Sequence, residues 1–551
     1  MSCIEKRLSI VLGQINPVVG DITNNTQKII KIIDDFPHAD LVVFPEMSLV
    51  GYPLMDHIYD PLIRKRNQES IEKIRSLKTD ATIIIGTFTE SKAICNSLHP
   101  FYNSAVIIEN NKIKAIVNKR LLPDYDVFDE HRYFSFDNQF FPVEIKGVKT
   151  GILICEDLWD DSYDVKVSKE LVSNGAELLI AINASPYHIN KPALREKLIK
   201  KKVKELSVPV IYLNMVGGMD EIVYDGQSMI VDHLGNIVFK AKPFEEDWTI
   251  INLVLNNKKI AYPYLNTLDW REEVLKALEL NLRDYFFKSG IFLGAVLGLS
   301  GGIDSAFTAY ICTKALGKDK VHAIMMPTKF TSKESLDLAK KLCKNLGIHY
   351  KVHPINELFS SYEKDIQENI GKVDFDIADE NLQSRIRATI LMYYSNKFDW
   401  LLVSTGNKSE IGVGYCTLYG DTNGGKNIPG DLFKTQIYAI CDWINQNEKI
   451  IPRGIIKRPP TAELRENQKD SDSLPSYDVL DLILEEIMKK GIGTELEDLK
   501  DKRITPKKIE RVRSLYLNSE YKRRQLVQSI KISESAFGIG RKYPVLKKIP
   551  F

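Results

Sequence analysis

Cysteine is scarce in this sequence and long apolar runs are missing. Seven cysteines stand among 551 residues, and no two of them form a Cys-x-x-Cys pair. This pattern excludes a disulfide framework and the paired thiols of a structural zinc or iron–sulfur site. No run approaches the ~18 consecutive apolar residues of a membrane span, and the first residues show no signal-peptide pattern. We therefore expect a cytoplasmic protein with no membrane partner.

The sequence also lacks an excess of charge of either sign. Lys+Arg total 75 and Asp+Glu 73, a formal net charge of +2. Bulk electrostatic attraction to nucleic acid is therefore not expected. Hydrophobic residues make up 44% and charged residues 27%, as in soluble globular proteins. The length is several times the ~150 residues that serve as a soft unit of domain size, so we expect more than one domain.

The first half alternates short apolar runs with polar helical stretches. The runs typical of buried strands lie at 8–12, 41–44, 81–86, 104–108, 151–154 and 178–182. Helical patterns occupy 25–34 and 189–206, and Asn/Gly turns at 109–112 and 233–236 indicate antiparallel neighbours. The pattern predicts an α/β layered domain over residues 1–258. A linker is expected around Pro263, which breaks regular structure.

The second half, residues 259–551, follows a cleaner alternation. A helical pattern starts at Asp269, and apolar runs at 293–299, 321–326 and 400–403 are separated by helix-length segments. Such βαβ units predict a doubly wound parallel sheet of the Rossmann-like kind. The tail at 499–548 is rich in Lys and Arg, which on charge alone favours a solvated helical surface.

Three reactive side chains of the first half each follow a buried strand: Glu46, Lys119 and Cys155. An adjacent ammonium favours the thiolate, and a carboxylate can take the thiol proton and later activate water. Lys119 can stabilise an oxyanion. Taken singly, Cys155 is more often an inert buried thiol, and a Lys or Glu at a strand end is usually a solvated cap. Together they predict an amide-hydrolysing site.

The strings around these residues are Phe44-Pro-Glu-Met, Lys119-Arg-Leu-Leu-Pro and Cys155-Glu-Asp. They resemble the Glu-Lys-Cys signature of the nitrilase (carbon–nitrogen hydrolase) superfamily, which implies an αββα sandwich and hydrolysis through a thioester. Residues 123–134 and 183–191 resemble the glutaminase members. That resemblance implies that glutamine is held by Tyr125, Ser185 and Lys191, with Glu130 as the accessory carboxylate. A surface cation is the alternative for Lys191.

A glycine-rich loop follows the first strand of the second half and opens a helix. It comprises Gly298, Leu299, Ser300, Gly301, Gly302, Ile303, Asp304 and Ser305. Its backbone N–H groups and the helix N-terminus favour an anion, and Asp304 can hold Mg2+ against phosphates. The loop lacks the Gly-Lys-Ser/Thr ending of a P-loop. It resembles the loop of the ATP pyrophosphatases, which implies cleavage of ATP to AMP and pyrophosphate.

Combining the two sites predicts a glutamine-dependent amidotransferase, an ATP-dependent carbon–nitrogen ligase. The strings at 379–387, 404–410, 415–421, 461–470 and 521–525 resemble the family of glutamine-dependent NAD synthetases. That family implies amidation of deamido-NAD+ to NAD+ and association as a homo-oligomer, often an octamer. The implied contacts are Asn381, Glu410 and Lys522 to deamido-NAD+, Thr405 to ATP, and Glu410 with Asp304 to Mg2+.

Other interpretations stay open at this point. Asn381 could cap a helix, Thr405 could lie in a strand-end turn, Glu410 could be a first-turn helix charge and Lys522 part of the basic tail. The acceptor could instead be aspartate or a purine nucleotide. The phosphate loop also occurs in proteins that modify tRNA, although no Cys-x-x-Cys occurs here. A scaffold with both sites inactive is the last alternative.

Overall fold

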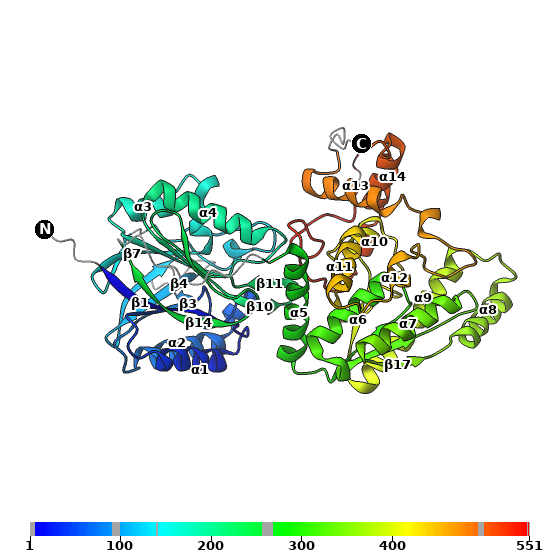
Figure 1. Cartoon of the computed structure of the whole chain (residues 1–551), viewed down its shortest axis with the longest axis horizontal. Helices are drawn as coiled ribbons and strands as arrows, with labels where there is room; N and C mark the ends of the chain where they lie inside the picture. Colours follow the sequence, from blue (N-terminus) through cyan, green and yellow to red (C-terminus); the bar gives the residue numbers. More distant parts are fainter. Residues whose placement is uncertain are drawn as a thin grey trace. The chain divides into compact units, whose positions relative to one another are not determined.

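The computed structural model describes residues 6–90, 100–138, 141–255, 268–493, 501–547 and 549. It divides into two compact units, 1–268 and 269–551 (Figure 1). No helix in these described ranges is long and apolar enough to cross a membrane. The predicted boundary at 258 and the predicted linker lie within 256–267, outside the described residues, so both stay predictions.

Two six-stranded sheets form the centre of the first unit. The strand orders are β14-β1-β2-β3-β4-β5 and β13-β12-β9-β8-β7-β6. The first sheet contains β1 (Arg7–Gln14), β2 (Leu41–Val43), β3 (Thr82–Glu90), β4 (Phe101–Glu109), β5 (Lys112–Asn118) and β14 (Asp247–Val254). The second contains β6 (Val143–Ile145), β7 (Val148–Ile154), β8 (Leu178–Asn183), β9 (Val210–Asn214), β12 (Met229–Val231) and β13 (Ile237–Lys240). A separate hairpin pairs β10 (Val216–Met219) with β11 (Ile222–Asp225).

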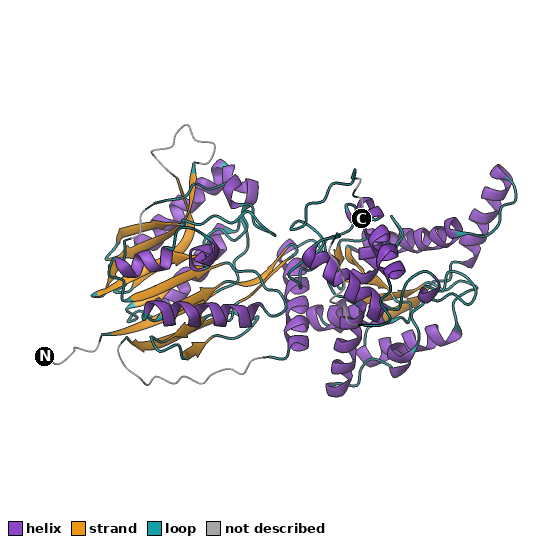
Figure 2. Ribbon diagram, turned by 90° about the horizontal axis from the view of Figure 1, so that it is seen from above, coloured by secondary structure: helices purple, strands orange, loops and turns teal. Residues whose placement is uncertain are grey.

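Helices cover the outer face of each sheet (Figures 1 and 2). One apolar core joins α1 (Ile22–Asp35) and α2 (Pro61–Arg75) to the first sheet. Another joins α3 (Val167–Ser173) and α4 (Lys191–Leu206) to the second. A third core lies between the sheets, with side chains from both. The layers run helix, sheet, sheet, helix, which confirms the predicted αββα sandwich.

Local chemistry explains the predicted hairpin between β4 and β5. The turn residues Asn110 and Asn111 have φ angles of 51° and 59°, as a two-residue turn of type I′ requires. The strands on either side pair in antiparallel fashion. The strands on either side of the turn at 233–236, β12 and β13, likewise pair in antiparallel fashion. Both Asn/Gly turns therefore join antiparallel strands, as predicted.

The second unit contains a five-stranded parallel sheet in the order β17-β16-β15-β18-β19. Its strands are β15 (Gly294–Gly298), β16 (Val321–Met325), β17 (His349–Val352), β18 (Trp400–Ser404) and β19 (Lys426–Asn427). The order reverses between β15 and β18, the switch point where ligands bind in doubly wound folds. The predicted doubly wound sheet is confirmed. The two edge strands escape prediction because β17 is exposed at all four positions and β19 has only two residues.

Helices connect and flank these strands (Figures 1 and 2). In chain order they are α5 (Trp270–Ser289), α6 (Ile303–Leu316), α7 (Lys333–Leu346), α8 (Asn356–Ile370), α9 (Ile377–Phe398), α10 (Lys408–Val413), α11 (Lys434–Asn447), α12 (Arg453–Lys457), α13 (Tyr477–Lys490), α14 (Pro506–Asn518) and α15 (Glu520–Arg523). The helix predicted from Asp269 begins there, because its carboxylate accepts the N–H of Arg271 as an N-cap.

Candidate active sites

The first candidate site lies where β2, β5 and β7 end. Lys119 Nζ lies 2.8 Å from Glu46 Oε1 and 2.9 Å from Glu130 Oε1. These three side chains are buried, and Cys155 is 3% exposed. Cys155 has a φ angle of 47°, an uncommon conformation for a residue other than glycine and one that clusters at functional sites. The chain folds so that the predicted Glu, Lys and Cys share one buried site.

Further residues fix the carboxylates of this site. Asn103 Nδ2 donates to Glu46 Oε1 at 2.7 Å, and the backbone N–H of Ala184 donates to Glu46 Oε2 at 2.8 Å. Tyr52 donates its hydroxyl to Glu130 Oε1 at 3.0 Å. Both oxygens of Glu46 are therefore held in place. Asn103 and Tyr52 escape sequence analysis, since a polar residue within or after an apolar run carries no chemical signature of its own.

Burial and charge set the protonation of the site. Burial raises the pKa of the Cys155 thiol well above its ordinary value; Glu46 raises it further and Lys119 opposes this. Burial alone would lower the pKa of Lys119, but the Glu130 and Glu46 carboxylates outweigh it and raise that pKa. Burial raises the pKa of Glu130 to about 7, against the effect of Lys119. At neutral pH the resting site therefore holds a neutral thiol beside an ammonium.

Two of the residues expected to hold glutamine, Tyr125 and Lys191, lie close enough to Cys155 for that residue to influence their pKa values. Tyr125 donates its hydroxyl to both oxygens of Glu156, at 3.1 and 3.0 Å, and Glu156 directly follows Cys155 in the chain. Ser185 is buried, and its backbone N–H donates to Asn214 Oδ1 at 2.9 Å. The site therefore offers hydroxyl groups and a carboxylate close to the nucleophile.

Lys191 opens α4 and is only partly exposed. Its Nζ lies 4.1 Å from the centre of the Trp159 ring, and in the described part of the chain it has no ion-pair partner. Burial, with a smaller contribution from Arg195, lowers the pKa of Lys191 to about 8, while the charges of Cys155 and Glu156 raise it. A half-buried ammonium without a carboxylate partner is suited to an anionic ligand. A simple surface cation is therefore the less favoured interpretation, and the predicted contact of Lys191 with glutamine stays a prediction.

The second candidate site surrounds the loop between β15 and α6. Gly301 has a φ of +83°, and a Cβ there would lie 2.3 Å from the Ser335 carbonyl oxygen, so only glycine fits. Ser305 Oγ lies 3.1 Å from Ser300 Oγ and accepts the Ser300 N–H at 3.3 Å. Ser305 thus shapes the loop from inside. The helix N-terminus that follows favours an anion.

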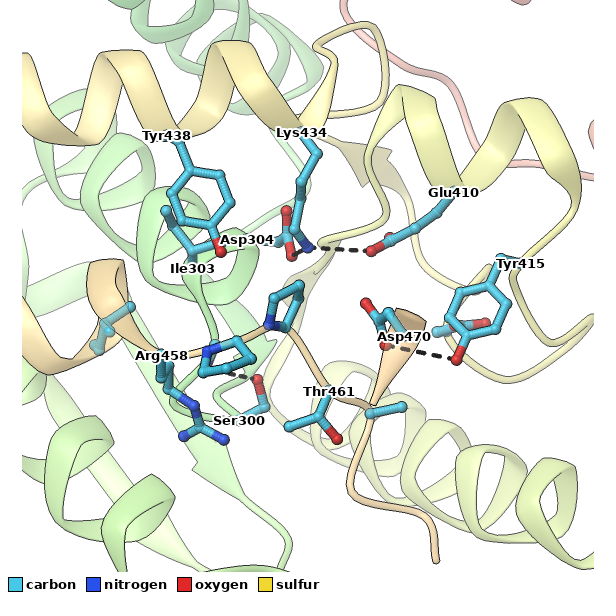
Figure 3. Close-up of a pocket in the computed structure, with 16 residues that line it drawn as sticks. Ser300, Ile303, Asp304, Glu410, Tyr415, Lys434, Tyr438, Arg458, Thr461 and Asp470 are labelled. Atoms are coloured by element: carbon cyan, nitrogen blue, oxygen red, sulfur yellow. Dashed lines mark hydrogen bonds and ion pairs between the residues drawn. The ribbon is translucent and has the colours of Figure 1, made fainter. Parts of the chain in front are cut away.

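Two neighbouring cavities open on this loop. A cavity of about 130 Å³ is lined by Ser300, Gly302, Ile303 and Asp304 together with Glu410, Tyr415, Lys434, Arg458, Thr461 and Asp470 (Figure 3). A cavity of about 290 Å³ is lined by Gly298, Leu299, Ser300 and Thr405 together with Met326, Arg387 and Leu391. Ser300 belongs to both. The smaller cavity is rich in charged groups, whereas the larger has the apolar walls that a nucleoside requires.

Two carboxylates meet at one ammonium in the smaller cavity. Lys434 Nζ lies 2.5 Å from Asp304 Oδ2 and 3.3 Å from Glu410 Oε1 (Figure 3). Asn407 Nδ2 donates to Asp304 Oδ1 at 3.0 Å. Burial, together with Asp304 and Asp470, raises the pKa of Glu410 to about 7, although Lys434 lowers it. These carboxylates come from α6 and α10, on opposite sides of the sheet's switch point.

The donor set fits Mg2+. In the described ranges no group of three or more His, Cys, Asp or Glu side chains could hold a metal alone. Mg2+ is usually bound by one or two carboxylates plus substrate phosphates. Asp304 and Glu410, which already share one cation, provide that number of carboxylates beside a phosphate-binding loop.

The residues predicted to contact deamido-NAD+ are Asn381, Glu410 and Lys522. Asn381 Oδ1 accepts the hydroxyl of Thr417 at 2.6 Å. The helix α9 begins at Ile377 with Asp376 as its N-cap, so the alternative that Asn381 caps a helix is wrong. Glu410 does lie in the first turn of α10. Neither Asn381 nor Lys522 is among the residues that line the two cavities.

Lys522 holds the end of α10 in place. Its Nζ donates to the carbonyl oxygens of Gly414 and Cys416 at 2.8 and 2.7 Å. These carbonyls belong to the helix end and the turn behind Glu410. Lys522 is therefore bound to backbone and is not simply part of a solvated basic tail. Its predicted contact to deamido-NAD+ stays a prediction.

Comparison with known proteins covers both units. Residues 10–258 match the carbon–nitrogen hydrolase family and residues 274–526 the NAD synthase family. A glutamine-dependent NAD(+) synthetase of Synechocystis sp. is 39% identical, covering 98% of each chain. That of Aquifex aeolicus is 37% identical, covering 98% of this chain and 99% of its own.

A solved structure extends this similarity to three dimensions. The glutamine-dependent NAD+ synthetase from Acinetobacter baumannii, in complex with ADP, is 35% identical with a TM-score of 0.78, covering 98% of both chains. The similarity runs through both units, so an aspartate or purine nucleotide amidotransferase, a tRNA-modifying enzyme and an inactive scaffold are all disfavoured. The chain belongs to the glutamine-dependent NAD(+) synthetases, which are ATP-dependent amidotransferases of the ligase class.

Proposed function

We propose that this protein hydrolyses glutamine at Cys155 and uses the ammonia to convert deamido-NAD+ to NAD+, with ATP cleaved to AMP and pyrophosphate. The observation that carries the proposal is the presence of two sites in one chain. In the first unit a buried Lys119 lies between Glu46 and Glu130, and in the second unit a phosphate loop lies beside paired carboxylates. Product analysis after incubation with ATP, Mg2+, glutamine and deamido-NAD+ tests it. NAD+, AMP, pyrophosphate and glutamate are expected, and aspartate or xanthosine monophosphate offered as the acceptor should give no amidated or aminated product.

In the first unit, Glu46 takes the thiol proton as the sulfur of Cys155 attacks the glutamine amide carbon. Lys119, whose pKa is raised, stabilises the oxyanion that forms. Glu46 returns the proton to the leaving nitrogen, which departs as ammonia and leaves a thioester. Glu46 then deprotonates a water that attacks the thioester, releasing glutamate and restoring the thiol. Glu130, with its raised pKa, holds Lys119 from the other side.

Recognition of glutamine requires groups for its charged head. We assign the carboxylate of glutamine to Lys191, which in the described structure lacks an anionic partner. The amino group is suited to Glu156, which already accepts the hydroxyl of Tyr125. Ser185 lies in the loop after β8, the strand beside that of Cys155. These groups distinguish an amino acid from a simple amide.

The pKa of Lys191 gives a pH prediction. Because that pKa is lowered to about 8, the ammonium is charged below pH 8 and neutral above it. Glutaminase kcat/KM should therefore fall between pH 8 and 9, by about tenfold per pH unit at most, mainly through KM. The variant Lys191→Arg keeps a charged group and should remove most of this fall. A flat profile for the unaltered protein over that range would contradict the assignment.

In the second unit, a carboxylate becomes an acceptor for ammonia only after adenylation. The carboxylate of deamido-NAD+ attacks the α-phosphorus of ATP and pyrophosphate leaves; ammonia then attacks the acyl carbon and AMP leaves. The loop N–H groups and Lys434 would hold the phosphates. Thr405 and Arg387 line the larger cavity, which we assign to the nucleoside of ATP. Mg2+ held by Asp304 and Glu410 would neutralise charge on the phosphates.

Glu410→Gln tests the metal assignment. The amide keeps the size of the side chain but removes one of two negative charges, so we expect the Mg2+ concentration for half-maximal ammonium-driven NAD+ synthesis to rise about tenfold or more. Magnesium titration of the variant and the parent measures this. Glutaminase activity is the internal control and should not change. An unaltered Mg2+ requirement would remove Glu410 from the metal site.

We also propose that the protein is a cytoplasmic homo-oligomer. The described cysteines are free thiols, as expected in a reducing compartment. Exposed apolar side chains gather on α8, α9 and the segment between them, including Ile370, Ile377 and Tyr393 at 64–68% exposure. Apolar surface of this kind typically marks contacts with another protein. Sedimentation analysis should give a mass above that of one chain.

A further inference from the structure

One buried carboxylate beside the thiol is not used in the chemistry above. Asp157 lies in the short helical turn at Cys155–Leu158 and is 2% exposed. Its Oδ1 accepts the backbone N–H groups of Arg120 and Leu121, at 3.0 and 2.8 Å. Its Oδ2 accepts the N–H of Ile154 at 3.1 Å. A single carboxylate thus binds three backbone groups from two distant segments of the chain.

Each of these segments carries a reacting group. Arg120 directly follows Lys119, at the end of β5 in the first sheet, and Ile154 directly precedes Cys155, at the end of β7 in the second sheet. The core between these sheets consists of apolar side chains. Such packing keeps the two sheets together, but it does not set an exact distance between the ends of β5 and β7. Hydrogen bonds to an ionised carboxylate are short, directional and stronger than neutral ones. Asp157 therefore links the backbone next to Lys119 to the backbone next to Cys155 through hydrogen bonds.

We propose that Asp157 is a positioning residue for amide hydrolysis, which fixes the Lys119 ammonium relative to the Cys155 sulfur. The proposal rests on the assignment of Cys155 as the nucleophile. Lys119 stabilises the oxyanion only if it lies where charge develops, and a misplacement of about 1 Å can cost ~10²-fold in rate. Within the described residues, the Asp157 carboxylate makes no hydrogen bond to the side chains assigned to glutamine, because its hydrogen-bond partners are backbone N–H groups elsewhere. Binding of the substrate should therefore depend on it much less.

Asp157→Asn tests the proposal with little change in volume. One atom of the amide can still accept hydrogen bonds, but the NH2 group must face at least one backbone N–H as a second donor. Asp160→Asn is a matched control. Asp160 is also a buried aspartate, five residues after Cys155, but its carboxylate binds Ser168 and Lys202, outside the catalytic segments.

In the full-length protein we expect Asp157→Asn to lower glutaminase kcat about 10²-fold, with the KM for glutamine within threefold. The rate at which iodoacetamide alkylates Cys155 can be followed on the Cys155 peptide by mass spectrometry. This rate should depend on pH differently in Asp157→Asn than in the parent protein. Asp160→Asn should keep kcat within about threefold. Ammonium-driven NAD+ synthesis should stay within twofold in both variants and reports that the chain is folded.

Equal losses in the two variants, an unchanged kcat, or an effect confined to KM would overturn the proposal. If Asp157→Asn also lost the ammonium-driven reaction, Asp157→Ser, which leaves room for a water, is judged by the same criteria. Cys155→Ala separates this proposal from the function on which it rests. Glutaminase activity that survives Cys155→Ala would refute the nucleophile, whereas a wild-type kcat in Asp157→Asn with an inactive Cys155→Ala would refute only the positioning role.

Discussion

We expect Cys155→Ala to abolish NAD+ formation from glutamine, by at least about 10⁴-fold, and to leave ammonium-driven NAD+ formation within twofold of the parent. Losing the nucleophile of a covalent mechanism typically costs a factor of that order or more. Alanine fits the same buried space, so the fold of the first unit should survive. The second unit contains the phosphate loop and the paired carboxylates and should accept added ammonia unaided.

The measurement compares NAD+ formation with glutamine and with ammonium chloride as alternative nitrogen donors. Cys343→Ala is the control, because Cys343 is another buried free thiol but lies on α7 of the second unit. It should leave both reactions within about twofold. Glutamine-driven synthesis that persisted in Cys155→Ala would refute the assigned nucleophile. Loss of both reactions in a folded variant would refute the division of labour between the two sites.

Asp304→Asn should have the second-largest effect, with NAD+ formation lowered about 10³-fold for either nitrogen donor. Asp304 pairs with Lys434 through one oxygen and accepts the Asn407 amide through the other. Asparagine preserves the shape but removes the charge that balances Lys434 and that would help to hold the proposed Mg2+. Loss of one preorganised charge at a phosphoryl-transfer site has effects of this size.

Glutamate release measured without ATP is the internal readout for Asp304→Asn and should persist. Asp442→Asn, which removes an exposed carboxylate from α11 of the same unit, controls for loss of charge and should act like the parent. Normal NAD+ output from Asp304→Asn would exclude Asp304 from the ATP site. An equal loss in Asp442→Asn would show that the effect is not specific to the site.

The residues that sequence analysis identifies are those with a local signature. Cys155 and Lys119 directly follow the apolar runs that form β7 and β5. Gly301 has a φ angle that only glycine adopts readily. These patterns fix both the strands and the chemistry at their ends. For the same reason the αββα sandwich and the doubly wound sheet are predictable, because both depend on runs of apolar residues and on turns.

Other residues of the sites could not be predicted, because only the folded chain brings them together. Asn103 and Glu46 are separated by 57 positions, and Lys434 and Asp304 by 130. Lys434 lies in no string with a chemical signature, and Asp157 is distinguished only by the three N–H groups it accepts. Arg387 and Asp470 fall within strings that resemble the family, but their side-chain roles need the cavity walls to be seen.

Transfer of labelled nitrogen tests the central claim most directly. The protein is incubated with ATP, Mg2+, deamido-NAD+ and glutamine that carries ¹⁵N only in its side-chain amide, and the NAD+ formed is analysed by mass spectrometry. The two-site account predicts NAD+ one mass unit heavier, with the label in the carboxamide of nicotinamide, and no labelled NAD+ from Cys155→Ala. NAD+ that forms from this mixture without the label would contradict it.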